Sequence, residues 1–295
     1  MLISGVRVLS NTLLVITLIL LSSHSLAKKG GFGGLSKAEP TPCPECENLE
    51  GFLPADEIDD EIRRMVGKYR RGAAKNVAIQ KARGVIETYL KTDFIGGANC
   101  PEIDSEQWAI DYSHKRPRAA LHKGIDIPQP RGTPIRAIAD GMVVANFLNS
   151  GNRKGIEIML RHTPEDTGLE FWTYSQYTHL EALSDLAVGA RVNMGDVIGS
   201  TSNTGKMGRR IRRDALHFAV LYADNPFWSH DGYVVAPKDS YFMDPVAFYR
   251  PEGPYDSVSM LNLPGQEKLI KIPYLSEDGS LYPAHTKRIW PYVCN

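Results

Sequence analysis

Residues 121–145 have the sequence LHKGIDIPQPRGTPIRAIADGMVVA, and this stretch decides the fold class. Short apolar and β-branched runs alternate in it with Gly and Pro, which form turns and interrupt helices. Runs of the same kind continue downstream, so we expect strands at residues 133–138, 142–145, 156–160, 171–177, 196–199 and 216–222. Their close spacing predicts a mainly β domain, an antiparallel sandwich or barrel.

The remainder of the chain divides into segments of different composition. Residues 28–50 are rich in Gly and then in Pro, which predicts a flexible linker. Apolar residues at three- and four-residue spacing predict a helical N-terminal segment over residues 51–97, with the periodicity continuing to Tyr89. We place the β domain at residues 98–250. Residues 251–295 predict a C-terminal extension that lies over it.

The N-terminus has the features of an export signal. Arg7 precedes an apolar run at residues 13–21, and small residues lead up to Ala27. We expect a signal peptide over residues 1–27, with the mature chain in the periplasm or cell envelope, or secreted. An uncleaved anchor is the alternative, but the run is shorter than the ~20 residues that span a bilayer as a helix. No other segment predicts a transmembrane span in the mature form.

Size and charge exclude some classes of protein. The chain has 295 residues and 42% hydrophobic residues, enough for a packed core. Lys plus Arg equal Asp plus Glu at 34 each, so no net charge attracts nucleic acid or an anionic membrane. We therefore expect no nucleic-acid partner.

Four cysteines accompany the export signal. An oxidising compartment would allow Cys43, Cys46, Cys100 and Cys294 to form disulfides in any of three pairings. We favour Cys43 with Cys46 and Cys100 with Cys294, because the second bond would tie together the two flanks of the β domain. A thioredoxin-like role for the Cys-x-x-Cys sequence is not favoured, since no βαβ pattern surrounds it. A zinc knuckle is not favoured either, since no second pair of close ligands follows.

Residues that bind metals recur in the β region. His122 and Asp126 lie four residues apart, and a straight strand at ~3.3 Å per residue would separate them by roughly 13 Å. A bend or bulge at Gly124 would turn both inward. Taken alone, this pair is better explained by a surface histidine beside a turn aspartate.

A second histidine lies in an alternating strand. His217 shares one predicted face with Ala215, and with Arg213 if the strand extends that far, whereas the large apolar residues lie on the other face. His217 therefore points away from the core. His179 follows an aromatic-rich run and, taken alone, would be a hydrogen-bonded structural histidine.

Together these residues resemble the lysostaphin/LytM-type zinc metallopeptidases, which have the duplicated-hybrid-motif fold and cut peptide cross-links in bacterial cell walls. The resemblance covers residues 121–248, a little under half of the chain. The motifs that carry it are, in order, His122–Ile127, Gly132–Pro134, Ala139–Val143, Tyr177–Leu180, Val188–Gly189, Gly195–Gly199, Asn203–Gly205, Leu216–Phe218 and Met243–Pro245.

The resemblance implies a role for each of these polar residues. His122, Asp126 and His217 would bind zinc, and His179 would be one of two further histidines beside the site. The other histidine is replaced by Ala215, which neither accepts a proton nor stabilises an oxyanion. Arg213 is a candidate substitute, because it could stabilise negative charge although it cannot act as a base.

The sequence therefore predicts an exported zinc metallopeptidase, an endopeptidase acting on peptidoglycan peptides. Two alternatives remain open. The first is a non-catalytic member that binds wall peptides or regulates a separate cell-wall hydrolase. The second is an exported structural domain whose metal stabilises the fold.

Overall fold

The computed structural model describes residues 43–66, 73–112, 121–149, 154–205, 213–230, 232 and 234–295. These residues all belong to one compact unit, residues 39–295. The predicted signal peptide and the first part of the predicted linker, residues 28–42, lie outside the described residues. None of the helices in the described ranges has the length and apolar character needed to cross a bilayer.

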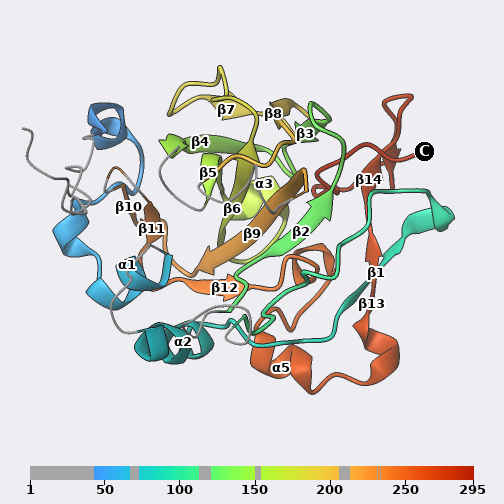
Figure 1. The fold of residues 1–295 in the computed structure, drawn as a ribbon, viewed down its shortest axis with the longest axis horizontal. Coiled ribbons are helices and arrows are strands. Elements are labelled where there is room, and N and C mark those ends of the chain that lie inside the picture. Colours follow the sequence, from blue (N-terminus) through green and yellow to red (C-terminus); the bar gives the residue numbers. More distant parts are fainter. Residues whose placement is uncertain are drawn as a thin grey trace, which may run out of the picture. The chain divides into compact units, whose positions relative to one another are not determined.

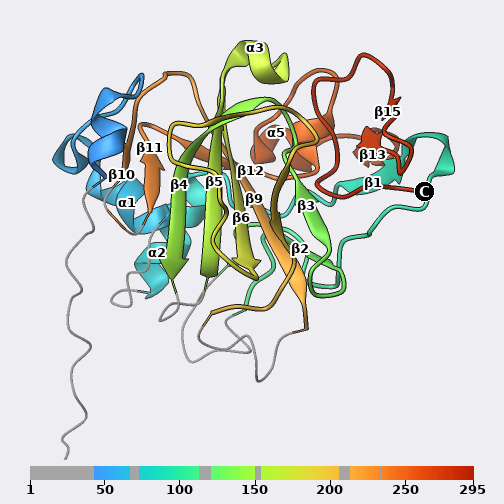
Figure 2. The ribbon, with the colours of Figure 1, turned by 90° about the horizontal axis from the view of Figure 1, so that it is seen from above.

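A seven-stranded antiparallel sheet forms the centre of the unit (Figures 1 and 2). Its strands follow the order β12-β9-β6-β5-β4-β7, and β2 also pairs with β9. Figure 2 shows β4, β5 and β6 lying side by side. The seven strands are β2 (Ile125–Pro128), β4 (Gly141–Asn149), β5 (Gly155–His162), β6 (Trp172–Leu180), β7 (Arg191–Val192), β9 (Ala215–Ala223) and β12 (Tyr241–Met243).

Four two-stranded sheets surround this central sheet, and only the β1–β13 pair is parallel. They are β1 (Lys91–Phe94) with β13 (Leu269–Ile272), β3 (Pro134–Arg136) with β8 (Val197–Ser200), β10 (Trp228–His230) with β11 (Val235–Pro237), and β14 (Tyr274–Leu275) with β15 (Leu281–Tyr282). The predicted mainly β class is confirmed, and a strand lies in each of the six predicted ranges.

Burial explains why the central strands form. Every residue of β5 is buried, and so is every residue of β6 after Trp172, so both faces of these two strands are covered although each strand also contains polar residues. Tyr177 in β6 and Phe218 in β9 pack together with ring centroids 5.4 Å apart, and neither is exposed. This close packing fixes the register of the strands that carry the polar residues described below.

The helices are short. They comprise α1 (Asp60–Val66), α2 (Ala73–Ala82), α3 (Pro164–Thr167), α5 (Ser257–Leu261) and the 3₁₀ helices η1 (Pro44–Asn48), η2 (Ala55–Glu57), η3 (Ile95–Gly97), η5 (Ala247–Tyr249) and η6 (Gly265–Lys268).

Helix α2 ends before the predicted periodicity does. The periodicity predicted helix as far as Tyr89, but residues 85–90 are not helical. The chain turns at Gly84, which has φ +94° and lies so close to Phe242 that an added Cβ would be 2.4 Å from its carbonyl oxygen. Val85 is then buried outside any helix, so its apolar character reflects packing and not helical periodicity.

The C-terminal extension is attached to the rest of the unit by a strand pair and a disulfide. Strand β13 pairs with β1, as Figure 1 shows, and Cys294 is bonded to Cys100. Cys43 is bonded to Cys46. Both predicted pairings are confirmed.

Candidate metal centre

Two histidines and an aspartate converge at one point. His122 Nε2 lies 2.9 Å from His217 Nδ1, which lies 2.9 Å from Asp126 Oδ1. His122 Nε2 and Asp126 Oδ1 are 3.4 Å apart. His122 and Asp126 are buried and His217 is half-buried. A single ion between these atoms would contact all three donors.

Strand pairing and one glycine bring the donors together. Asp126 in β2 pairs directly with His217 in β9, so their side chains share a face. His122 precedes β2, and the chain bends at Gly124 as predicted. A Cβ at Gly124 would lie 2.4 Å from the Phe218 carbonyl oxygen and 2.9 Å from Cε1 and Nε2 of His217. Glycine is therefore needed for the close approach of the His217 ring and of the Phe218 carbonyl oxygen.

A segment before the site orients His122. Its Nδ1 donates a hydrogen bond to the Gln107 carbonyl oxygen at 2.8 Å, so Nε2 directs its lone pair toward the other donors. Backbone bonds from Ala109 N–H to the His122 carbonyl and from His122 N–H to the Ile110 carbonyl hold this segment in place. The ring of Tyr112 packs edge-on against His122, with centroids 5.4 Å apart.

The electrostatics of the cluster favour its charged form. Burial opposes a charge on Asp126, but hydrogen bonds and charge from His122 and His217 outweigh it and hold the pKa of Asp126 well below its ordinary value. Burial also opposes a charge on His122, but the Asp126 carboxylate and the Gln107 carbonyl raise its pKa. Protonation of His122 and metal binding would therefore compete for the same nitrogen, Nε2.

His179 reaches the same face through a β-bulge. In the β5–β6 pair, Ile156 lies opposite Leu180 and Glu157 lies opposite Thr178, which leaves His179 as the extra residue. His179 has φ +69°, an uncommon conformation for a residue other than glycine. The bulge re-aims its side chain, and its ring centroid lies 6.0 Å from that of His217.

Thr204 holds the His179 ring. His179 Nδ1 lies 3.0 Å from the Thr204 carbonyl oxygen and donates to it. The Thr204 hydroxyl donates to the Leu180 carbonyl at 2.7 Å and accepts from Ile156 N–H at 3.1 Å. Gly155 lies directly against Thr204: an added Cβ would be 2.4 Å from the Thr204 carbonyl oxygen. These contacts place the proton of a neutral His179 ring on Nδ1.

Ala215 lies in the strand that carries His217, whereas Arg213 lies before that strand. Ala215 is the first residue of β9, is buried, and shares the face of His217 as predicted. The strand does not extend to Arg213, so the condition under which Arg213 would share that face is not met. The guanidinium of Arg213 instead forms an ion pair with Asp104, and the side chain is 53% exposed.

The donor set fits zinc. Two imidazole nitrogens and one carboxylate oxygen form a three-ligand set that is typical of hydrolytic zinc sites. The Gln107 carbonyl behind His122 is the kind of second partner that metal-binding histidines have. Within the described ranges no further His, Cys, Asp or Glu joins this group, which leaves a coordination position for water or substrate.

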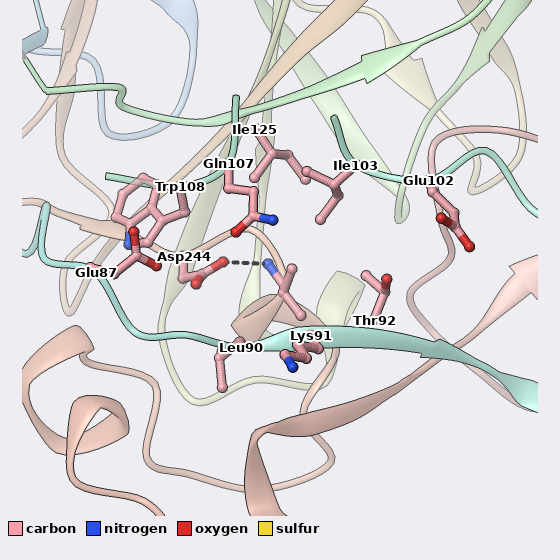
Figure 3. Close-up of a pocket in the computed structure, with 11 residues that line it drawn as sticks. Glu87, Leu90, Lys91, Thr92, Glu102, Ile103, Gln107, Trp108, Ile125 and Asp244 are labelled. Carbon is pink, nitrogen blue, oxygen red and sulfur yellow. Dashed lines mark hydrogen bonds between the residues drawn. The ribbon is translucent and has the colours of Figure 1, made fainter. Parts of the chain in front are cut away.

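A cavity of about 200 Å³ lies beside the segment that contains Gln107 (Figure 3). Gln107 and Ile125 line it, and Asp244 accepts a hydrogen bond from Val246 N–H there. Asp244 also accepts a hydrogen bond from the Thr88 hydroxyl. Burial raises the pKa of Asp244 to about 7. This carboxyl group therefore titrates near neutral pH.

Sequence reasoning missed the groups that orient the site. The carbonyls of Gln107 and Thr204 anchor His122 and His179, but a backbone acceptor has no residue signature. The Asn-Thr-Gly sequence at 203–205 was the only available signal for Thr204.

An antiparallel sheet that brings two histidines and an aspartate to one point, with a third histidine on a bulge beside them, is the arrangement expected of a lysostaphin/LytM-type peptidase. Residues 120–228 match the model of peptidase family M23. The matched range includes all four of these residues.

Curated relatives match a part of the chain. The DD-carboxypeptidase/endopeptidase Mpg of Neisseria meningitidis serogroup B is 38% identical over 86 residues, 29% of this chain and 17% of that protein. The peptidoglycan DD-endopeptidase ShyC of Vibrio cholerae serotype O1 is 34% identical over 101 residues, 34% of this chain and 20% of that protein. The chain thus spans a fifth or less of the length of these two relatives.

Solved structures are also similar in part. The structure of LytU is 26% identical, with a TM-score of 0.37 over 61% of this chain and 97% of that one. The catalytic domain of lysostaphin from Staphylococcus simulans is 27% identical, with a TM-score of 0.28 over 35% of this chain and 68% of that one.

Proposed function

We propose that this protein is a zinc-dependent endopeptidase that hydrolyses peptide cross-links of bacterial peptidoglycan. The observation that carries the proposal is the convergence of His122, Asp126 and His217 within hydrogen-bonding distance. The names of Mpg and ShyC, both endopeptidases, support the reaction class, and that of ShyC supports the substrate.

In this proposal His122, Asp126 and His217 hold the zinc ion. Zinc bound there would supply Lewis acidity for a peptide carbonyl and make water more acidic. Gln107 keeps His122 in the tautomer that offers Nε2. Asp126 would contribute one negative charge, which would offset only part of the charge of a divalent ion.

His179 acts as the proton carrier. Its Nδ1–H is bound to the Thr204 carbonyl, so Nε2 is the atom that would take a proton from attacking water and deliver it to the leaving amine. Ala215 provides no second group of this kind, and Arg213 is paired with Asp104. The chemistry then depends on a single proton-handling histidine.

The test is digestion of isolated sacculi by the purified protein with zinc, followed by mass analysis of released muropeptides. We expect products cleaved in the cross-links, and none from His179→Ala. The His217→Ala variant should lose most of its zinc by elemental analysis. Full zinc retention in His217→Ala would contradict the ligand assignment.

Ala215 favours a second candidate, a zinc-loaded protein that binds wall peptides or regulates another hydrolase. It predicts tight binding to sacculi without release of muropeptides, and activation of a separate cell-wall hydrolase on mixing. A purely structural role for zinc predicts instead that chelation unfolds the chain. Circular dichroism before and after chelation distinguishes this outcome from both of the others.

The location and the division of the chain belong to the same proposal. We place the mature protein in the periplasm or cell envelope, with residues 1–27 removed. We assign residues 28–50 as linker, 51–97 as the N-terminal segment, 98–250 as the peptidase domain and 251–295 as the extension. The two disulfides support an oxidising compartment. N-terminal sequencing of protein recovered from the envelope would test the first boundary.

A further inference from the structure

A second group of metal-binding side chains lies outside the peptidase site. The sulfurs of Cys43 and Cys46 and a ring nitrogen of His230 all lie within 4.8 Å of one another. The two cysteines form a disulfide at the start of η1, and His230 ends β10, far along the chain. Cys46 is fully buried, whereas Cys43 and His230 are half-buried. A reductant therefore has access from the Cys43 side.

We propose that reduction of the Cys43–Cys46 disulfide creates a binding site for a soft divalent metal ion such as Zn²⁺, with His230 as the third ligand. A dithiol reductant supplies two electrons and two protons, the S–S bond breaks to give two thiols, and the reductant leaves as its own disulfide. The metal ion then displaces the two thiol protons and binds two thiolates and an imidazole. Sulfur and nitrogen donors of this kind suit zinc.

The His230 ring is already oriented. It packs against Phe147 with ring centroids 4.9 Å apart, and its Nδ1 accepts a hydrogen bond from Gly232 N–H at 3.1 Å. Coordination through Nε2 would move the ring proton to Nδ1, and coordination through Nδ1 would replace the Gly232 contact. In either mode a bond to the metal would replace the backbone hydrogen bond from Gly232.

The other disulfide lacks this arrangement. Cys100 and Cys294 are 7% and 1% exposed, and within the described ranges no His, Asp or Glu completes a group of three donors around them. The same chain therefore contains an internal control, a disulfide whose reduction should create two thiols without a third ligand. As candidate metal sites, the two disulfides differ because only Cys43 and Cys46 have a histidine, His230, close enough to be a third ligand.

The site lies on the sheet face that carries the peptidase centre, toward its opposite edge. Directly paired residues run across the sheet from Asp126 through His217, Thr178 and Glu157 to Phe147. Paired residues point to the same side, so the ring that supports His230 shares the face of His217. Metal binding at the new site would join the N-terminal 3₁₀ helix to β10.

The experiment is a Co²⁺ titration of the full chain before and after reduction. Binding is monitored through the thiolate-to-cobalt charge-transfer absorption in the near ultraviolet. The peptidase centre contains no sulfur and is silent in this band. We expect one equivalent of thiolate-bound cobalt after reduction and none before. The Cys43→Ser/Cys46→Ser double variant should abolish the band. His230→Gln should weaken binding by at least about tenfold, the least that loss of a group supporting a metal site costs.

Three outcomes would overturn the proposal: no band in the reduced wild type, an unchanged affinity in His230→Gln, or a band that persists in the double variant. A second measurement uses only the wild-type protein, so its result does not depend on whether the variants fold. Reduced protein is alkylated with and without Zn²⁺, and the modified cysteines are mapped by peptide mass. Zinc should protect Cys43 and Cys46 and leave Cys100 and Cys294 unprotected. Equal labelling of all four with and without zinc would contradict the site.

Discussion

Replacement of Gly124 by alanine should weaken the proposed metal centre although all three ligand residues are kept. The added Cβ would lie 2.9 Å from the His217 ring and 2.4 Å from the Phe218 carbonyl oxygen, whereas ordinary contact begins at 3.4 Å. The ring must therefore retreat by about 0.5 Å (3.4 − 2.9) and the carbonyl by about 1.0 Å (3.4 − 2.4). Metal sites tolerate ligand displacements of only about 0.2 Å.

This displacement sets the expected magnitude. Overpacking of this kind costs about 1–3 kcal/mol, and a loss of this size in ligand geometry weakens metal binding by roughly 5- to 150-fold. Zinc affinity is measured by competition with a chromophoric chelator, and thermal unfolding is followed with and without zinc. We expect the zinc-dependent rise in Tm to shrink in Gly124→Ala, because stabilisation by a ligand falls with its affinity.

Gly265→Ala is the matched control. Gly265 has no atom within 4 Å of an added Cβ, and its φ is not in the left-handed region. The control should bind zinc and unfold like the wild type. If Gly124→Ala retained wild-type zinc affinity, the close approach of His217 to the chain bend would not be what assembles the site.

Three further changes have defined outcomes. Ala215→His should raise turnover on wall peptides by about 10²-fold or more, because it restores a proton-handling group on the His217 face; an unchanged rate in the zinc-bound variant would contradict this. Thr204→Val should shift the pH profile of turnover through His179, whereas Thr204→Ser should restore it; identical profiles in all three proteins would remove Thr204 as a positioning residue. Burial raises the pKa of Asp244 from 3.8 to about 7, so its contribution to stability is present below pH 3.8 and is lost as the pH rises to about 7. Asp244→Asn should therefore flatten Tm across that range, and an unaltered Tm profile would refute the assignment.

The sequence predicted the strands because their apolar residues are both buried and β-branched. The set of His122, Asp126 and His217 came from the resemblance to the lysostaphin/LytM-type peptidases, and the possible bend at Gly124 and the alternation around His217 were consistent with it. The sequence-based prediction failed beyond Ala82, where Val85 is buried without being helical. Periodicity reports burial, and burial alone does not distinguish a helix from a packed extended chain.

The bulge at His179 and the ion pair of Arg213 could not be predicted, because both depend on segments that are distant in the sequence. The bulge at His179 depends on the relative register of β5 and β6, which is set by packing across the sheet. Arg213 was expected on the face of His217 only if the strand extended that far, and the strand begins at Ala215. Its ion pair with Asp104 joins residues more than a hundred positions apart, and no local pattern contains that information.

The Gln107 carbonyl that orients His122 lies outside the family domain at residues 120–228. A fragment cut at those limits would retain every ligand yet lose the acceptor that selects the His122 tautomer. It would also lose Cys100 and Cys294, whose bond closes the segment onto the C-terminal extension. Under the proposed function, we expect the smallest active fragment to be larger than residues 120–228, because the contacts that orient His122 and close the chain lie outside that range.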